Sequence, residues 1–304
     1  MGKIAFLFAG QGAQQPGMGK ALCGTAAGAE VFNALEAIRP GTMADCFEGS
    51  PERLAETDVT QPCVFAVDMA AAAALAAEGV RADGVAGFSL GEVAALGFAG
   101  AFSLEDAFRL VCQRSVLMRR ATDEEAGAMA AVLRLPNEVV EALCQKFERL
   151  YPVNYNCDGQ LVVAGRAEEI PAFCAEVKTA GGTARPLAVG GAFHSPLMAG
   201  AATAFSQILE AAPFETPALP VYANLTAAPY APPLRRTLAA QMENPVRWSD
   251  TIKRMAADGY DTFVEVGPGK TLTTLAKRIV PTARLANVQD TDSLKAALEL
   301  LAAG

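Results

Sequence analysis

The sequence predicts an α/β protein in which a small subdomain interrupts a larger domain with a parallel sheet. Short apolar stretches such as Lys3–Phe8 and Gly84–Gly87 alternate with helical stretches, which is typical of a parallel sheet covered by helices on both faces. Between residues 127 and 190 the order becomes strand, helix, strand, strand, helix, strand, the ferredoxin-like order. We therefore expect a discontinuous large domain, 1–126 with 191–304, and a small subdomain, 127–190.

The elements expected in the first part of the chain are separated by glycine-containing turns. Apolar residues at helical spacing indicate the helices, and short apolar runs that end in glycine indicate the strands. In order, they are a strand at Lys3–Phe8, a turn at Gly10–Gly12, a helix to about Leu22, a helix at Gln61–Glu78, a strand at Gly84–Gly87, a helix from Leu90 and a helix at Leu104–Ala121.

The same criteria apply to the rest of the chain, where Cys157–Gly159 also signals a turn between two strands. The small subdomain is expected to contain strands at Ala128–Leu133, Val153–Asn156, Gln160–Ala164 and Ala184–Val189, with helices at Asn137–Leu150 and Glu168–Ala180. The clearest later elements are strands at Leu219–Ala223 and Thr262–Val266 and a helix at Ser293–Leu301.

Composition argues against several classes of function. A net charge of −8 disfavours general nucleic-acid binding, because phosphate contacts need clustered Lys and Arg. Seven cysteines without CxxC spacing are typical of reduced thiols, and a single histidine disfavours a metal site. We expect no signal peptide and no membrane span, because the apolar runs Ile4–Ala9 and Met69–Ala77 are too short for either. We expect a cytoplasmic protein with neither nucleic acid nor membrane as partner.

The segment Gly87–Gly91 fits the GxSxG pattern, with a predicted strand before it and a predicted helix after it. In that context a sharp turn lifts the Ser89 hydroxyl above the sheet, and the glycines let the backbone pass without side-chain clashes. The alternative is a glycine-rich turn in which the serine only caps the helix. The flanking strand and helix favour a nucleophile at Ser89.

A serine nucleophile needs an adjacent base, and His194 is the only histidine in the chain. It lies in the glycine-rich segment Gly190–Pro196 after a predicted strand, and loops of this kind present catalytic groups. A lone histidine is more often structural, and spacing alone leaves a lysine or carboxylate base open. If Ser89 uses an imidazole, the imidazole belongs to His194.

Two glycine-rich segments resemble nucleotide-binding motifs but do not fit them. A GxGxxG fingerprint from Gly10 would need glycine at Gln15, and a P-loop ending at Gly269–Thr271 would need glycine at Val264. The turn at Gly10 can instead supply one N–H group of an oxyanion hole, with the Leu90 N–H as the other.

Arg114 lies in the predicted helix Leu104–Ala121, one turn from Met118, so the two side chains share a face. One interpretation is a surface arginine whose stem packs along the helix. The other is a guanidinium that faces a pocket and binds a carboxylate through two parallel hydrogen bonds. The residues alone leave both interpretations open.

Together these segments closely resemble the malonyl-CoA:acyl carrier protein transacylases, nearly from end to end and in that family's order. The matching segments are FAGQGAQ (Phe8–Gln14), TQP (Thr60–Pro62), GFSLGE (Gly87–Glu92), QRSVLM (Gln113–Met118), GAMAAV (Gly127–Val132), VNYNCDGQLVVAG (Val153–Gly165), AFHSPLM (Ala192–Met198), NPVRW (Asn244–Trp248) and EVGPGKTL (Glu265–Leu272). The resemblance implies an α/β-hydrolase-like parallel-sheet core with an inserted ferredoxin-like subdomain. The stand-alone length favours the bacterial enzymes of fatty-acid synthesis over those of polyketide pathways.

The resemblance also implies a ping-pong transfer of malonyl from malonyl-CoA to the phosphopantetheine thiol of holo acyl carrier protein, through a malonyl ester of Ser89. Its implied residues are His194 as general base and acid, Gln11 and Leu90 as backbone oxyanion donors, Arg114 as the ligand of the malonyl carboxylate, Asn156 beside the pantetheine arm, and Arg247 as the residue whose backbone carbonyl orients His194. Protein groups supply this chemistry, so we expect no metal and no organic cofactor.

Two positions bear on the substrate. Phe193 resembles the malonyl-type loop of the family, in which a bulky side chain leaves little room for a 2-methyl branch. Phe88 departs from the family, since most members have histidine before the nucleophile. This departure changes the shape of the pocket and removes a hydrogen bond, but it does not remove the base.

Two other functions compete with acyl transfer. Arg114 argues against an acyl hydrolase that clears carrier proteins, and the presence of both Ser89 and His194 argues against a non-catalytic docking protein. Carrier proteins are acidic, as this chain is, so docking needs a local basic patch. The candidates for it are Lys270, Lys277, Arg278 and Arg185, and we expect the protein to be a monomer.

Overall fold

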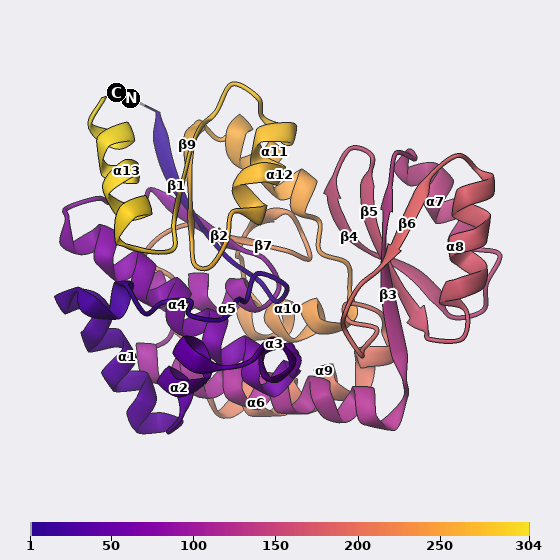
Figure 1. Cartoon of the computed structure of the whole chain (residues 1–304), viewed down its shortest axis with the longest axis horizontal. Coiled ribbons are helices and arrows are strands. Elements are labelled where there is room, and N and C mark those ends of the chain that lie inside the picture. Colours follow the sequence, from indigo (N-terminus) through magenta and orange to yellow (C-terminus); the bar gives the residue numbers. More distant parts are fainter. Residues whose placement is uncertain (1, 304) are drawn as a thin grey trace.

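The computed structural model describes residues 2–303 and contains two sheets (Figure 1). The larger sheet has the strand order β10-β9-β1-β2-β7-β8, and all neighbouring strands in it are parallel except β7 and β8. This arrangement confirms the predicted α/β class with a parallel-sheet core. Its strands are β1 (Lys3–Phe8), β2 (Gly84–Gly87), β7 (Val221–Ala223), β8 (Ala228–Pro229), β9 (Tyr260–Val266) and β10 (Arg284–Val288).

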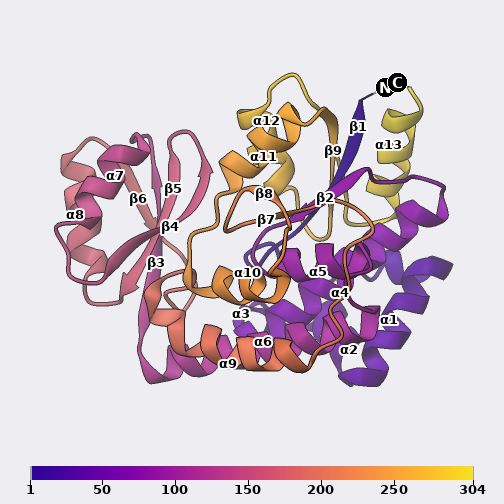
Figure 2. The ribbon, with the colours of Figure 1, turned by 180° about the vertical axis from the view of Figure 1, so that it is seen from behind.

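Helices cover both faces of the larger sheet because its strands bury side chains alternately on either side. In β1, Phe6 and Phe8 join the core beneath α4, α5 and α6, while Ala5 and Leu7 join the core beneath α11 and α12. Seen from behind, α9 lies in contact with both α6 and α10 (Figure 2). The helices of this part are α1 (Ala26–Ile38), α2 (Thr42–Glu48), α3 (Pro51–Ala55), α4 (Thr57–Ala77), α5 (Leu90–Phe98), α6 (Leu104–Glu124), α9 (Ala199–Ala211), α10 (Leu234–Ala240), α11 (Trp248–Ala257), α12 (Thr271–Ile279) and α13 (Thr291–Ala302).

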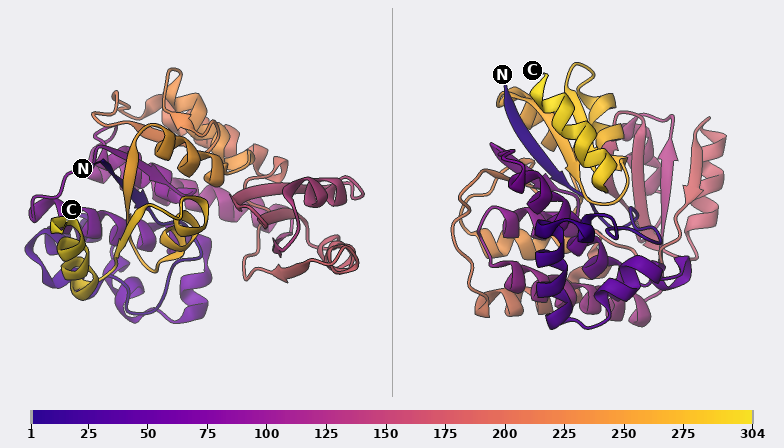
Figure 3. Two further views of the ribbon diagram at one scale, coloured as in Figure 1. Left: turned by 90° about the horizontal axis from the view of Figure 1, so that it is seen from above. Right: turned by 60° about the vertical axis from the view of Figure 1, so that its left-hand side comes forward.

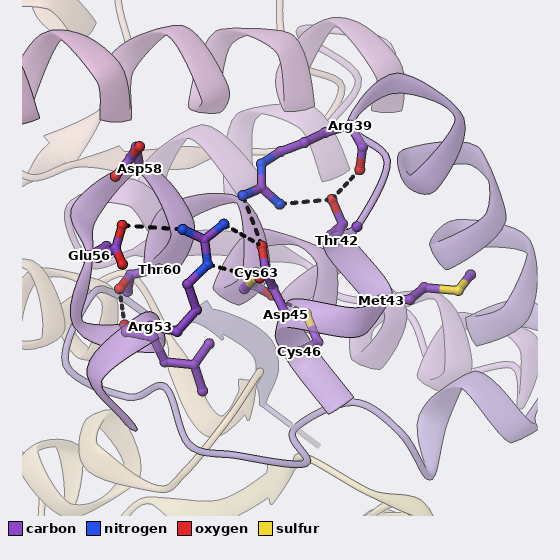
Figure 4. A network of polar contacts seen from close by, with 12 residues as sticks. Arg39, Thr42, Met43, Asp45, Cys46, Arg53, Glu56, Asp58, Thr60 and Cys63 are labelled. Carbon is purple, nitrogen blue, oxygen red and sulfur yellow. Dashed lines mark hydrogen bonds and ion pairs between the residues drawn. The ribbon is translucent and has the colours of Figure 1, made fainter. Parts of the chain in front are cut away.

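Helix α4 is the central helix of the larger core. By length and composition it is apolar enough to cross a membrane, and 89% of its apolar stretch is buried inside the protein. Ion pairs hold the corner where it begins, because Arg53 of α3 binds Asp45 of α2 and Glu56 immediately before α4 (Figure 4). This corner fixes the first turns of α4, which carry Gln61 toward the site described below.

Two predicted helices differ from the observed elements. The segment after β1 forms turns and the short 3-10 helix Leu22–Gly24 instead of a helix up to Leu22. Gly17 and Gly19 have φ angles of 84° and 76°, and this left-handed conformation interrupts an α-helix. The helix expected to reach Leu150 ends at Cys144, and Leu150 begins the next strand.

The smaller sheet is antiparallel, with the strand order β4-β5-β3-β6, and projects to one side of the larger part (Figure 3). Its elements are β3 (Gly127–Leu133), α7 (Asn137–Cys144), β4 (Leu150–Cys157), β5 (Gln160–Arg166), α8 (Ile170–Thr179) and β6 (Thr183–Pro186). Their order is the predicted ferredoxin-like one, and α7 and α8 share a core with one face of the sheet. The domain boundaries at 127 and 190 stay a prediction.

Candidate active site

Ser89 stands at the turn between β2 and α5, with a φ of 56° and a ψ of −107°. This conformation is strained for a residue with a side chain, and such strain collects at functional sites. Close backbone packing requires the glycines on either side. A Cβ atom at Gly91 would lie 2.3 Å from the Phe8 carbonyl oxygen, and one at Gly87 would lie 1.9 Å from backbone atoms of Gly91. Both glycines are therefore needed for the turn that presents Ser89, Gly87 for contacts within the turn and Gly91 for contacts with β1.

His194 lies beside Ser89, and both side chains are almost completely buried. The Nε2 atom of His194 is 2.7 Å from Ser89 Oγ, and its Nδ1 atom is 2.9 Å from the backbone carbonyl oxygen of Gln241. Because a carbonyl only accepts hydrogen bonds, Nδ1 carries the ring proton and Nε2 is left to accept the serine proton. The pair has the geometry of an activated nucleophile and its base.

The carbonyl that orients His194 belongs to Gln241, so the prediction of Arg247 is wrong. Arg247 is the N-cap of α11, and its carbonyl oxygen accepts hydrogen bonds from the N–H and the hydroxyl of Thr251, each at 2.9 Å. The carbonyl at the start of a helix is committed to the helix in this way. Gln241 begins the short 3-10 helix Gln241–Glu243, and its carbonyl oxygen lies 2.9 Å from His194 Nδ1.

Burial, followed by the positive charge of Arg114, lowers the pKa of His194 to about 4. The imidazole is therefore neutral near pH 7, the state in which it accepts a proton from serine. A neutral histidine also leaves Arg114 as the cation next to the nucleophile.

Arg114 is fully buried and faces the nucleophile rather than the surface. Its Nη2 atom lies 3.2 Å from Ser89 Oγ and 2.9 Å from Gln241 Oε1, and its Nη1 atom lies 2.7 Å from Gln61 Oε1. Burial lowers the pKa of Arg114 to about 10, so it stays charged at neutral pH. Within residues 2–303 its Nε has no hydrogen-bond partner, and no carboxylate lies within 4.0 Å of the guanidinium. The site therefore holds a buried cation without a direct counterion.

Two side-chain amides that we did not predict hold the strained backbone of Ser89. Asn224 Oδ1 accepts a hydrogen bond from the Ser89 N–H at 2.8 Å, and Gln241 Nε2 donates to the Ser89 carbonyl at 2.7 Å. Asn224 directly follows β7, at the carboxyl edge of a parallel sheet, where functional residues collect. This position could have identified it from the sequence. Gln241 carries no such signal, because its position depends on packing between helices.

The predicted oxyanion donors lie on two adjacent turns. Gln11 follows β1, Leu90 is the first residue of α5, and the Phe88 N–H donates to the Phe8 carbonyl at 3.0 Å, which ties the two turns together. Neither the Gln11 N–H nor the Leu90 N–H has an acceptor within the part of the chain that the structure describes. An oxyanion hole needs N–H groups without an acceptor, so the assignment of these two donors stays a prediction.

Two cavities adjoin at the site, and the first of them reaches Ser89. The first, of about 300 Å³, is lined by Ser89 and His194 together with Met118 and Phe193. The second, of about 200 Å³, is lined by Asn156 and by residues of α12. Gln11, Gly12, Phe88, Asn154 and Leu187 line both. Asn154 was not predicted, although its spacing of two from Asn156 places both on one face of β4.

Phe88 packs its ring against Trp248, with 5.4 Å between the ring centroids. It therefore forms an apolar wall where the two cavities meet, in place of a polar side chain. Among residues 2–303, no three His, Cys, Asp or Glu side chains gather as a metal site requires. The absence of a metal and of a cofactor stays a prediction that rests on the chemistry of the protein groups.

Comparisons with known proteins show the family to which the chain belongs. The model of the acyl transferase domain matches residues 5–294. The chain is 34% identical over 311 residues to the malonyl CoA-acyl carrier protein transacylase of Bacillus subtilis, covering 99% of this chain and 98% of that protein. It is 33% identical, with a TM-score of 0.95, to the crystal structure of the malonyl CoA-acyl carrier protein transacylase from Clostridium perfringens, covering 99% and 98% of the two chains.

A further solved structure is the malonyl-transacylase PlMCAT in complex with AntF, a type II PKS acyl-carrier protein. The likeness to it has a TM-score of 0.94 and 35% identity, and covers 98% of this chain and 99% of that one. The family model, the sequence identity over the full length and the fold all indicate the same family. This chain belongs to the acyl transferase domain family, among the malonyl CoA-acyl carrier protein transacylases.

Proposed function

We propose that this protein transfers malonyl from malonyl-CoA to the phosphopantetheine thiol of holo acyl carrier protein, through a malonyl ester of Ser89. The observation that carries the proposal is the buried cation of Arg114, whose Nη2 lies 3.2 Å from Ser89 Oγ. In a malonyl ester of Ser89 the free carboxylate stands one methylene beyond the ester carbonyl, within reach of that guanidinium. A carboxylate accepts two parallel hydrogen bonds from arginine and supplies the missing counterion.

The first half-reaction forms the ester. Ser89 Oγ attacks the thioester carbonyl while its proton passes to His194 Nε2, and the N–H groups of Gln11 and Leu90 bind the oxyanion. When the C–S bond breaks, His194 returns the proton to the CoA sulfur. The Nδ1 hydrogen bond to the Gln241 carbonyl stabilises the imidazolium between these steps.

The second half-reaction runs the same steps in reverse. The phosphopantetheine thiol gives its proton to His194 and attacks the ester carbonyl, and Ser89 leaves with that proton. We propose that the pantetheine arm enters along the second cavity, past Asn156 and Asn154, whose amide oxygens are buried without a partner among the described residues. These two amides can hydrogen-bond the amide groups of the arm.

The carrier protein would dock where basic residues flank the second cavity. Lys270 lines a hollow with Gln160 and Leu275, both of which also line that cavity. Arg185 is the register neighbour of Ala131, which lines the cavity from the small sheet. We propose that the reaction serves fatty-acid synthesis in the cytoplasm and that the protein acts as a monomer.

The test is the intact mass of the protein after mixing with malonyl-CoA, beside Ser89→Ala, followed by addition of holo acyl carrier protein. We expect an adduct of malonyl mass that requires Ser89 and moves to the carrier. An adduct lost to water at the same rate with and without the carrier would indicate a hydrolase. No adduct with malonyl-CoA, on protein shown to be folded by circular dichroism, would overturn the proposal.

A further inference from the structure

Glu92 is a fully buried carboxyl group one turn behind the nucleophile on α5, and the chemistry described above does not use it. Its Oε2 accepts a hydrogen bond from the backbone N–H of Asn224 at 2.7 Å, and its Oε1 accepts one from the Tyr230 hydroxyl. Buried carboxylates without a cation in direct contact are costly. An ionised Glu92 in this core therefore needs a positive charge nearby to offset that cost.

A chain of hydrogen bonds joins Glu92 to the acyl site. Glu92 holds the backbone of Asn224, whose side-chain oxygen receives the Ser89 N–H at 2.8 Å and lies 3.4 Å from Gln241 Nε2. Gln241 Oε1 in turn accepts from Arg114 Nη2 at 2.9 Å. Glu92 and Arg114 are thus opposite charges that share a buried network without touching.

Of the ionisable side chains that the structure describes in this network, namely Glu92, Arg114, His194 and Tyr230, Glu92 is the one whose charge changes near pH 7. Burial raises the pKa of Glu92 to about 7, while hydrogen bonds from Tyr230 and Asn224 and the charge of Arg114 oppose the rise. Burial lowers the pKa of His194 to about 4, and burial together with Glu92 raises the pKa of Tyr230, so both stay neutral. Two other buried ionisable groups on elements next to α5 face elsewhere: Asp68 of α4 lies against Gly267, and Tyr222 of β7 bonds Asp258.

We propose that Glu92 is a positioning residue that supplies the resting counter-charge of Arg114, and that it takes up a proton when the carboxylate of the acyl group replaces it there. In the free enzyme the buried site holds Arg114 and an ionised Glu92. In the malonyl ester it holds Arg114 and the malonyl carboxylate, and Glu92 is neutral. The site keeps one cation and one anion in both states, which avoids a second buried negative charge.

The inference rests on the proposed function and predicts a linkage between pH and acyl group. In the malonyl ester the carboxylate of the acyl group neutralises the charge of Arg114. The pKa of Glu92 is therefore higher in the ester than in the free enzyme. Well below pH 7 the carboxyl is protonated in both states and no proton is taken up. Above pH 7 it is ionised only in the free enzyme, so malonyl loading becomes less favourable as pH rises, by up to about tenfold per pH unit. Acetyl loading brings no carboxylate and lacks this effect.

The experiment measures proton uptake with an indicator dye in weak buffer, on stoichiometric enzyme mixed with malonyl-CoA or acetyl-CoA, while intact mass counts the ester. The proton of Ser89 passes to the CoA thiol in both reactions, so the difference between the two substrates isolates the acyl site. We expect uptake approaching one proton per malonyl ester at pH 8, little at pH 5.5, and none with acetyl at either pH. Glu92→Gln, which keeps the shape and one acceptor, should load malonyl without uptake.

The outcomes separate the two proposals. If no malonyl ester forms, the proposed function fails, and this result is distinct from a failure of the role of Glu92, which is judged only on ester that has formed. If wild-type ester forms in full at pH 8 without proton uptake, the role of Glu92 is overturned, whatever happens to the variant. If uptake persists in Glu92→Gln, another group takes the proton and the assignment is wrong. Tyr230→Phe serves as a second variant, since losing its hydrogen bond should raise the pKa of Glu92 and shift the uptake to higher pH.

Discussion

The Nδ1 atom of His194 lies 2.9 Å from the backbone carbonyl oxygen of Gln241, on the side of the ring away from Ser89. The same glutamine donates from Nε2 to the Ser89 carbonyl at 2.7 Å and accepts at Oε1 from Arg114 at 2.9 Å. One residue thus orients the base, the nucleophile and the cation. An amide suits this position because it offers a donor and an acceptor on one planar group, and its backbone adds a second acceptor.

Replacing Gln241 by leucine should distinguish the role of its side-chain amide from the role of its backbone carbonyl. The carbonyl to His194 remains, but Arg114 and the Ser89 carbonyl each lose a buried partner, at a cost of about 1–3 kcal/mol for each group. We expect kcat/KM for malonyl loading, measured by stopped-flow mixing or quench, to fall by about 100-fold. Arg247→Ala is the control, because its side chain makes only an exposed ion pair with Asp250 at 2.8 Å. An equal loss in both variants would contradict the assignment of Gln241.

The low pKa of His194, about 4, should appear in the pH dependence of Ser89 reactivity. A group whose pKa is depressed stays neutral down to that value, so the base remains competent where an ordinary histidine is already protonated. The inactivation rate by a neutral sulfonyl fluoride should stay constant from about pH 7.5 to about pH 5.5. A rate that halves near the ordinary histidine value would contradict this. Arg114→Ala should move the acid limb to higher pH, because it removes a positive charge beside the imidazole.

Arg114→Ala should change the preference for malonyl over acetyl more than it changes the rate of acyl transfer to Ser89. Malonyl loading loses its charge-assisted hydrogen bonds and should fall by about 100-fold or more, while acetyl loading survives or rises. Parallel measurement of malonyl loading and acetyl loading by intact mass gives the ratio of the two rates directly. Arg114→Lys should recover part of the malonyl rate, since it keeps the charge without the fork. Equal losses for both acyl groups would mean that Arg114 is structural.

Reversing the charges of Lys270 and Arg185 together should weaken the carrier half-reaction alone. We expect the KM for carrier protein to rise by about tenfold, with a weaker dependence on salt, while malonyl loading stays unchanged. Lys178→Glu with Lys295→Glu is a matched control on exposed helix faces of α8 and α13. Unchanged KM in the first pair would remove both residues from the docking surface.

Two of the predicted docking residues, Arg278 and Lys277, make hydrogen bonds within the protein. Arg278 donates to Gln160 Oε1 at 2.7 Å and to the Asp158 carbonyl at 2.9 Å, so it links α12 to the turn between β4 and β5. Lys277 donates to the Pro281 carbonyl at 3.1 Å, at the end of its own helix. Reversal of Arg278 would therefore alter the fold near the second cavity as well as the surface charge. Lys277→Glu alone is the cleaner variant of the two.

The prediction from sequence succeeded where short-range rules apply. Alternation of strands and helices established the parallel sheet and the ferredoxin-like order, and the strand, turn and helix around Ser89 follow from the glycines at 87 and 91. The helix expected before Leu22 failed for a local reason, because Gly17 and Gly19 adopt left-handed angles that the spacing of apolar residues does not reveal. The identity of His194 as the candidate base followed from its being the only histidine.

The partners of these residues depend on packing between distant segments. Gln241 is 152 residues from Ser89 and 47 from His194, and Asn224 is 135 residues from Ser89. The prediction of Arg247 missed the carbonyl by six positions, because the start of α11 and the turn before it decide which carbonyl is committed to a helix. The direction of Arg114, toward the nucleophile and not toward solvent, likewise depends on how α6 packs against α4 and α5. The candidate nucleophile and base are thus set by local sequence. Their orientation and the buried charge beside them arise only when the chain has folded, because hydrogen bonds between remote residues form only after the cores have packed.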